Sequence, residues 1–176
     1  MEPGEALSTA AQIAVALAGF AGVVVAFREG SLREWAPIDK YRLWLLLANS
    51  ATPLVFCLFG ILVLTVKPTP AWIWGWCSGF ATVVQLPFLI MNGRNLAQVG
   101  SDAVRDIGPY RYVFYGMAIA GTGVIVCQIV NAVFLNLFWI FFLGIAFQLA
   151  AGILQFTRMI LLPPHTSKTW IRQNRI

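Results

Sequence analysis

Five long runs of apolar residues divide this chain, and they constrain its fold more than any other feature. A helix needs about 20 predominantly apolar residues to cross the hydrocarbon core of a bilayer. Runs of this kind cover residues 7–27, 43–66, 71–91, 112–133 and 135–162. A helix satisfies its own backbone hydrogen bonds, which a segment in lipid requires. The sequence therefore predicts an all-α polytopic integral membrane helical bundle, with five transmembrane helices in a single transmembrane domain.

If the five runs cross the membrane, the Lys and Arg residues in the loops are distributed unevenly between its two sides. Eleven of the twelve fall on one side. They are Arg28, Arg33, Lys40, Arg42, Arg94, Arg105, Arg111, Arg158, Lys168, Arg172 and Arg175. Lys67 lies on the opposite side, with Glu2 and Glu5. Because cytoplasmic loops carry the excess of Lys and Arg, we expect the N-terminus outside and the C-terminus inside, with residues 163–176 as a basic cytoplasmic tail.

The composition indicates lipid, more than water, as the main solvent. Hydrophobic residues make up 59% of the chain and charged residues only 11%, whereas soluble domains carry about 25% charged residues. The net charge of +5 does not predict nucleic-acid binding, because the basic residues lie beside apolar runs, where they set topology and contact anionic headgroups on the inner face. We expect a multi-pass protein of a cell membrane, with a bacterial inner membrane as the host.

The junction between the last two runs, residues 131–136, is short and uncharged. A tight hairpin is the first interpretation of this segment. A re-entrant segment is the alternative.

Small residues recur along the first run at intervals of four, at Ala10, Ala14, Ala18, Gly22 and Ala26. Small side chains on a helix face let two backbones approach closely in lipid. The pattern predicts a helix-packing face, without deciding whether the partner helix belongs to the same chain or to another copy. Because five short spans make a thin bundle, we expect a homo-oligomer.

The apolar runs lack ionisable side chains at their centres. No Asp, Glu, Lys or His lies in the middle of a run, which argues against a proton pump or a proton-coupled transporter. The one histidine, His165, lies in the tail, and Cys57, Cys77 and Cys127 form no CxxC pair. With no nucleophile paired to a base and no metal-ligand cluster, we expect a protein that is not an enzyme and that holds no metal or cofactor.

Neutral polar residues are the remaining chemistry inside the runs. For each one, interhelical hydrogen bonding is the simpler explanation. Taken together, they also suit a water-filled lumen between hydrophobic constrictions. The candidates for lining a pore are Asn49, Thr52, Ser78, Thr82, Gln85, Gln148 and Gln155.

Three arginines between the third and fourth runs, Arg94, Arg105 and Arg111, are candidates for binding anions or headgroups at the inner mouth. Solvated charges that only set the topology are the alternative.

These features favour a small homo-oligomeric channel or pore for ions or small polar solutes, lined by neutral polar residues. The alternative is a non-catalytic membrane subunit, anchor or sensor that acts through helix–helix contacts and through lipid or protein binding, with a protein partner that the sequence does not identify. A lipid-active enzyme lacks a recognisable nucleophile, and a secondary transporter lacks the expected repeat.

Overall fold

The computed structural model describes residues 2–27, 37–66, 68, 71–98 and 110–161. This part of the chain is helical and contains no strand. Its elements are α1 (Pro3–Phe27), α2 (Pro37–Thr65), α3 (Ile73–Gln98), α5 (Tyr110–Val130), the π-helical turn η1 (Asn131–Leu135) and α6 (Phe138–Leu161). Five helices are long and apolar enough to span a membrane, which confirms the predicted fold class.

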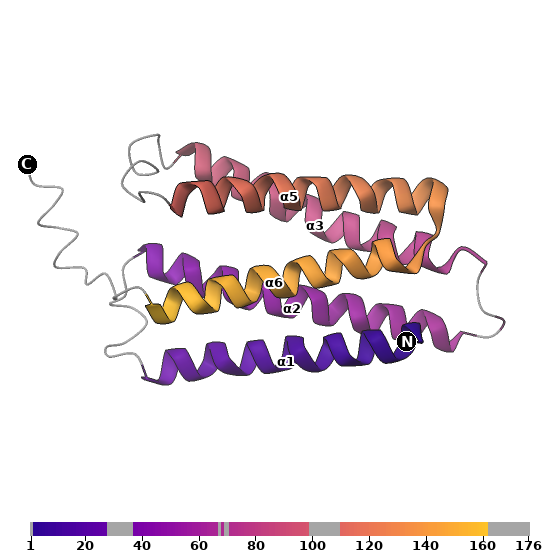
Figure 1. Ribbon diagram of the computed structural model, residues 1–176, viewed down its shortest axis with the longest axis horizontal. Coiled ribbons are helices and arrows are strands. Elements are labelled where there is room, and N and C mark those ends of the chain that lie inside the picture. Colours follow the sequence, from indigo (N-terminus) through magenta and orange to yellow (C-terminus); the bar gives the residue numbers. More distant parts are fainter. Residues whose placement is uncertain (1, 28–36, 67, 69–70, 99–109, 162–176) are drawn as a thin grey trace, which may run out of the picture.

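The helices run up and down in an elongated bundle (Figure 1). One end, called here the hairpin end, holds the start of α1, the connection from α2 to α3, and η1. At the other, the tail end, α1, α3 and α6 finish while α2 and α5 begin. The tail end is the side that the charge distribution predicts to face the cytoplasm.

Helix α6 is the central element, because it contacts all four of the other spanning helices. The main core cluster joins α6 to α1, α2 and α3 around Leu7, Phe56, Cys77, Phe141 and Ile145, which are buried. A second cluster continues toward the tail end, but it draws only on α1, α2 and α6. Helices α1, α2 and α6 are therefore packed over most of their length, while α3 joins the core mainly near the hairpin end.

The junction between α5 and α6 is a tight hairpin. Helix α5 continues directly into η1, and the chain then turns at Asn136, which has the left-handed backbone angles φ 52° and ψ 43°. Asparagine is one of the few residues that adopt this conformation readily. Because α5 with η1 and α6 are each long and apolar enough to span a membrane, this turn joins two span-length helices, as the hairpin interpretation predicts.

The small-residue stripe of α1 divides between two environments. Ala10 and Ala14 are buried and Ala18 is half-buried, whereas Gly22 and Ala26 are exposed. An interval of four residues exceeds the helical repeat of 3.6, so the stripe drifts around the helix. Within the chain, only its first part packs against neighbours. A packing role for its last part, against another copy, stays a prediction.

Candidate functional site

The polar side chains inside the bundle form two groups with different chemistry. One is a hydrogen-bond network at the hairpin end, in which the Oε1 atom of Gln128 alone among the described buried atoms has no partner. The other lines a cavity that extends from the middle of the bundle toward the tail end. The residues predicted to line a pore are divided between these two groups, except Thr52, which belongs to neither.

Asn131 is the centre of the hairpin-end network. Its buried side chain donates from Nδ2 to the Ser78 hydroxyl at 2.7 Å and to the Leu137 carbonyl at 3.1 Å, and its Oδ1 accepts from the Leu137 amide at 2.8 Å. The hydroxyl of Thr82 donates to the carbonyl of Ser78 at 2.9 Å. Ser78 and Thr82, two predicted pore-lining residues, therefore have hydrogen-bond partners within the chain.

Asn136 caps α3 from a different part of the chain. Its Oδ1 accepts from the backbone amides of Trp74 and Gly75, both at 2.9 Å, and its Nδ2 donates to the carbonyl of Ala71 at 2.9 Å. The first amides of a helix have no partner within that helix. In a membrane such groups need a protein partner, and Asn136 supplies it.

Two further contacts hold the hairpin in place. The Trp72 indole donates from Nε1 to the carbonyl of Ala132 at 2.9 Å. The amide of Gln128 donates from Nε2 to the carbonyl of Phe141 at 3.3 Å. That amide lies directly against Gly144 of α6, where a side chain would collide with it. A side chain at position 144 would therefore have to displace the Gln128 amide from its place against α6.

A cavity of about 170 Å³ lies between α2, α3, α5 and α6. Three of its polar wall residues, Asn49, Gln85 and Gln148, lie near the middle of their helices. The other polar residues, Tyr41, Gln155 and Arg158, lie nearer the tail end. The larger apolar wall residues are Leu45, Phe88, Leu89, Met117, Ile125, Phe147 and Leu154.

The cavity exists because α3 packs into the core near the hairpin end but not near the tail end. Helix α3 contributes Ile73, Cys77 and Ala81 to the main core but nothing to the cluster nearer the tail end. Figure 1 shows α3 and α5 diverging from α2 and α6 in that direction. Near the tail end, Trp44 of α2 and Phe88 of α3 stack with their ring centroids 5.4 Å apart.

Two amides in this cavity lack hydrogen-bond partners within the described part of the chain. They are the donor Nε2 of Gln85, whose side chain is 6% exposed, and the acceptor Oε1 of Gln148, which is 8% exposed. Asn49 differs, because its Nδ2 donates to the carbonyl of Leu45 at 2.9 Å. A buried polar group without a partner costs about 1–3 kcal/mol, so both glutamines are suited to an occupant of the cavity.

Proline adds an acceptor on the α2 side. Pro53 has no N–H, so the carbonyl of Asn49 lacks its usual helical donor. That carbonyl lies beside Gly152 of α6, 3.6 Å from the position a side-chain carbon would take there.

The structure brings together four of the predicted pore-lining residues. Asn49, Gln85, Gln148 and Gln155 line the same cavity, while Thr52 is half-buried and does not line it. Sequence reasoning did not assign Tyr41 and Arg158 to the wall or Asn136 to the cap. Tyr41 and Arg158 lie near helix ends, and nothing in the sequence there indicates that they face a cavity. Asn136 caps a helix that is distant in the sequence, so no local sequence pattern reveals the cap.

The arginines predicted at the inner mouth are less well defined. Arg94 belongs to α3 and Arg111 to α5, but their side chains lie outside the described part of the structure, as does the whole of Arg105.

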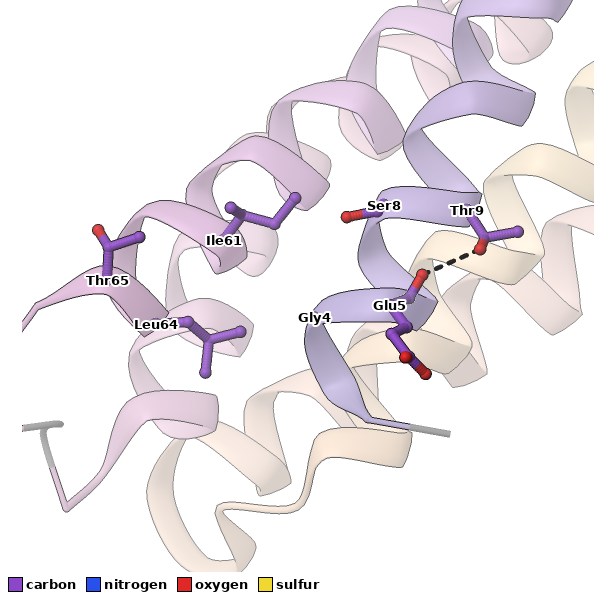
Figure 2. A pocket seen from close by; sticks show the side chains of 7 residues that line it. All are labelled: Gly4, Glu5, Ser8, Thr9, Ile61, Leu64 and Thr65. Atoms are coloured by element: carbon purple, nitrogen blue, oxygen red, sulfur yellow. Dashed lines mark hydrogen bonds between the residues drawn. The ribbon is translucent and has the colours of Figure 1, made fainter.

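A second hollow, of about 530 Å³, is an open groove between α1 and α2 at the hairpin end. Figure 2 shows Ser8 pointing toward α2 and Thr9 pointing away from it. The Thr9 hydroxyl donates to the Glu5 carbonyl at 2.9 Å and the Thr65 hydroxyl to the Leu62 carbonyl at 2.6 Å. These hydroxyls bond to their own helices, and the groove contains no buried polar group that calls for a ligand.

Among the described residues, no three His, Cys, Asp or Glu side chains come together. Cys57 and Cys77 are buried, and Cys127 is exposed.

Comparisons of the chain with protein-family models, with curated proteins and with solved structures found no match. The function must therefore be inferred from the cavity and the network beside it.

Proposed function

We propose that the protein is a non-catalytic membrane protein that binds a small amphipathic molecule in the cavity between α2, α3, α5 and α6. The observation that carries this proposal is the pair of buried glutamines, Gln85 and Gln148, which line one cavity and each keep one amide atom, a donor in Gln85 and an acceptor in Gln148, without a partner in the described part of the chain. Pockets for small molecules are typically apolar with a few well-placed polar groups.

The size of the cavity limits the occupant. Pockets for drug-sized ligands usually measure about 300–1,000 Å³, and this one measures about 170 Å³. An apolar cavity of about 150 Å³ is known to hold benzene. The occupant therefore has on the order of six to eight heavy atoms.

The hairpin-end network favours binding over free passage. Beyond the cavity, Asn131 bonds to the Ser78 hydroxyl and to the backbone of Leu137. These buried, bonded side chains occupy the space between the helices on that side, beside the Gln128 amide, whose Oε1 has no partner, and access is expected from the tail end.

Thiol accessibility provides the test. Ala151 lines the cavity, whereas its neighbour Ala150 is exposed on the outer surface of α6. In a Cys127→Ala background, in lipid nanodiscs, we expect Ala151→Cys to react with a small charged thiol reagent and Ala150→Cys, in lipid, to react slowly. A short amphipathic molecule should slow the reaction at position 151. If none of the short amphipathic molecules slows the reaction of Ala151→Cys, the proposal is contradicted.

A channel is the second candidate, and the line of polar residues beyond the cavity favours it. Gln128, Ser78 and Asn131 continue the polar side chains of the cavity toward the hairpin end and are buried. Opening the network would join them to Gln85 and Gln148, giving a path for ions or small polar solutes inside each chain of the predicted homo-oligomer.

Currents across planar bilayers under asymmetric salt, with solute flux into proteoliposomes, separate the two candidates. A channel predicts discrete currents or solute uptake that Gln148→Leu reduces without changing the oligomer mass. A silent, folded protein whose cavity still binds small molecules would remove the channel and leave the binding function.

We also propose that the tail end faces the cytoplasm of a bacterial inner membrane and that its basic segments contact anionic headgroups. The distribution of Lys and Arg supports this orientation. Labelling of a cysteine introduced near residue 170 only after the cytoplasmic face is opened would support it, and labelling from outside would overturn it.

A further inference from the structure

The two unpartnered glutamines restrict the chemistry of the ligand. Gln85 offers an N–H donor from α3, and Gln148 offers a carbonyl acceptor from α6. A group that satisfies both must contain an acceptor for the first and a donor for the second. On this basis, which rests on the proposed function, we infer that the ligand carries an uncharged polar head, a primary amide, hydroxyl or undissociated carboxyl, placed between Gln85 and Gln148.

A charged head fits this position poorly. A carboxylate has no donor for the Gln148 oxygen, and a primary ammonium has no acceptor for the Gln85 N–H. The polar wall residues beside these glutamines, Asn49 included, are uncharged. An ion held there without a counter-charge would carry a large desolvation cost. Arg158 lies ten residues along α6 from Gln148, which corresponds to about 15 Å along the helix, so the deep head group is out of its reach.

The remaining walls define the rest of the ligand. Between the glutamines and the tail end, the cavity is bounded by Leu45, Phe88, Met117 and Leu154. An apolar stem can cover these side chains and so remove apolar surface from water. The head therefore lies deepest, and the stem points toward the tail end. A six-carbon stem with an amide or hydroxyl head matches the volume of about 170 Å³.

Protection of Ala151→Cys from alkylation in nanodiscs tests this inference with matched probes. Hexanamide and 1-hexanol carry the expected head, hexanoate and hexylammonium at neutral pH carry charged heads of similar size, and acetamide carries the head without the stem. Concentrations are matched for the amount of each probe in the bilayer. We expect hexanamide and 1-hexanol to give half-protection at about tenfold lower concentration than either charged probe, as the satisfaction of one buried polar group implies. Acetamide should protect weakly.

Substitutions of the glutamines provide the second arm. Hexane, which has the stem without a polar head, is the reference probe in this arm. Gln85→Leu and Gln148→Leu should each remove most of the preference for hexanamide over hexane. Gln12→Leu is the matched control, because Gln12 is exposed on α1, a helix that does not line the cavity. This control should keep the preference. The ranking of head groups in the parent protein requires neither glutamine substitution, so it decides the question even if those variants misfold.

The outcomes separate the inference from the proposed function. If every six-carbon probe protects equally, or if the glutamine variants keep the preference, the cavity binds ligands but the head-group inference is wrong. If no probe protects although Ala151→Cys reacts, the cavity holds only water and the proposed function itself fails.

Discussion

At the scale of single residues, Asn136 combines two roles that rarely coincide. Its backbone turns the chain from η1 into α6 with a positive φ, and its side chain caps α3. An apolar residue here would leave two amide donors of α3 without a partner in lipid. The turn and the cap therefore depend on the same side chain.

Replacing Asn136 by alanine should lower the free energy of unfolding by about 1–3 kcal/mol, because the α3 amides lose their acceptor. Asn136→Gly loses the same acceptor but adopts the positive φ easily, so it should be the more stable of the two variants. Thermal unfolding in a mild detergent measures both. Equal stability of the alanine variant and the parent would show that the cap contributes nothing.

The buried amides of Asn131 and Gln148 make a matched pair with opposite expectations. Asn131→Leu leaves the Ser78 hydroxyl and the Leu137 amide without their partner, and we expect a loss of about 1–3 kcal/mol per unsatisfied group. Gln148→Leu removes an acceptor that has no partner in the described part of the chain, so the ligand-free protein should unfold at the same temperature or higher.

Thermal unfolding of both leucine variants, with and without hexanamide, is the measurement. The parent should gain stability from hexanamide by mass action, and Gln148→Leu should gain less. A Gln148→Leu variant as destabilised as Asn131→Leu would mean that the Gln148 amide is paired in the native state.

At the scale of elements, a glycine of α6, Gly144, shapes the contact between α5 and α6. Gly144 lets the Gln128 amide of α5 reach the carbonyl of Phe141 on α6. The helix contact and the hydrogen bond thus require each other. The same helix presents Gln148 to the cavity one turn further on.

Gly144→Ala should lower the free energy of unfolding by about 1–3 kcal/mol, because the new methyl group collides with the Gln128 amide. Combining it with Gln128→Ala should recover part of that loss, since the two changes are coupled. Gly123→Ala on α5 is the control, because nothing lies within 4 Å of its new carbon. Full additivity of the two alanine substitutions would contradict the proposed contact.

At the scale of the whole molecule, the apolar runs predicted five spanning helices because their length and composition depend only on local sequence. The partners of the polar residues could not be predicted in this way. Ser78 and Gln85 lie on one face of α3, yet the first bonds to Asn131 while the second faces the cavity. Periodicity gives the face of a helix, and tertiary packing decides which neighbour that face meets.

The same distinction applies to assembly. Ala14 is fully buried against the chain's own helices, whereas Gly22 is exposed and nothing lies within 4 Å of where its side chain would be. Gly22 is therefore available to a second copy, and Ala14 is not. If copies associate through this part of α1, a bulky side chain at position 22 should separate them and leave each chain folded.

Gly22→Leu should therefore shift the protein toward the monomer in native mass spectrometry from detergent, with little change in its unfolding temperature. Ala14→Leu should instead lower the unfolding temperature, because the larger side chain overpacks the core at a cost of about 1–3 kcal/mol. An unchanged oligomer in Gly22→Leu would place any contact between copies on another surface. A monomeric parent protein would remove the homo-oligomer, while the cavity, which lies within one chain, would remain the candidate site.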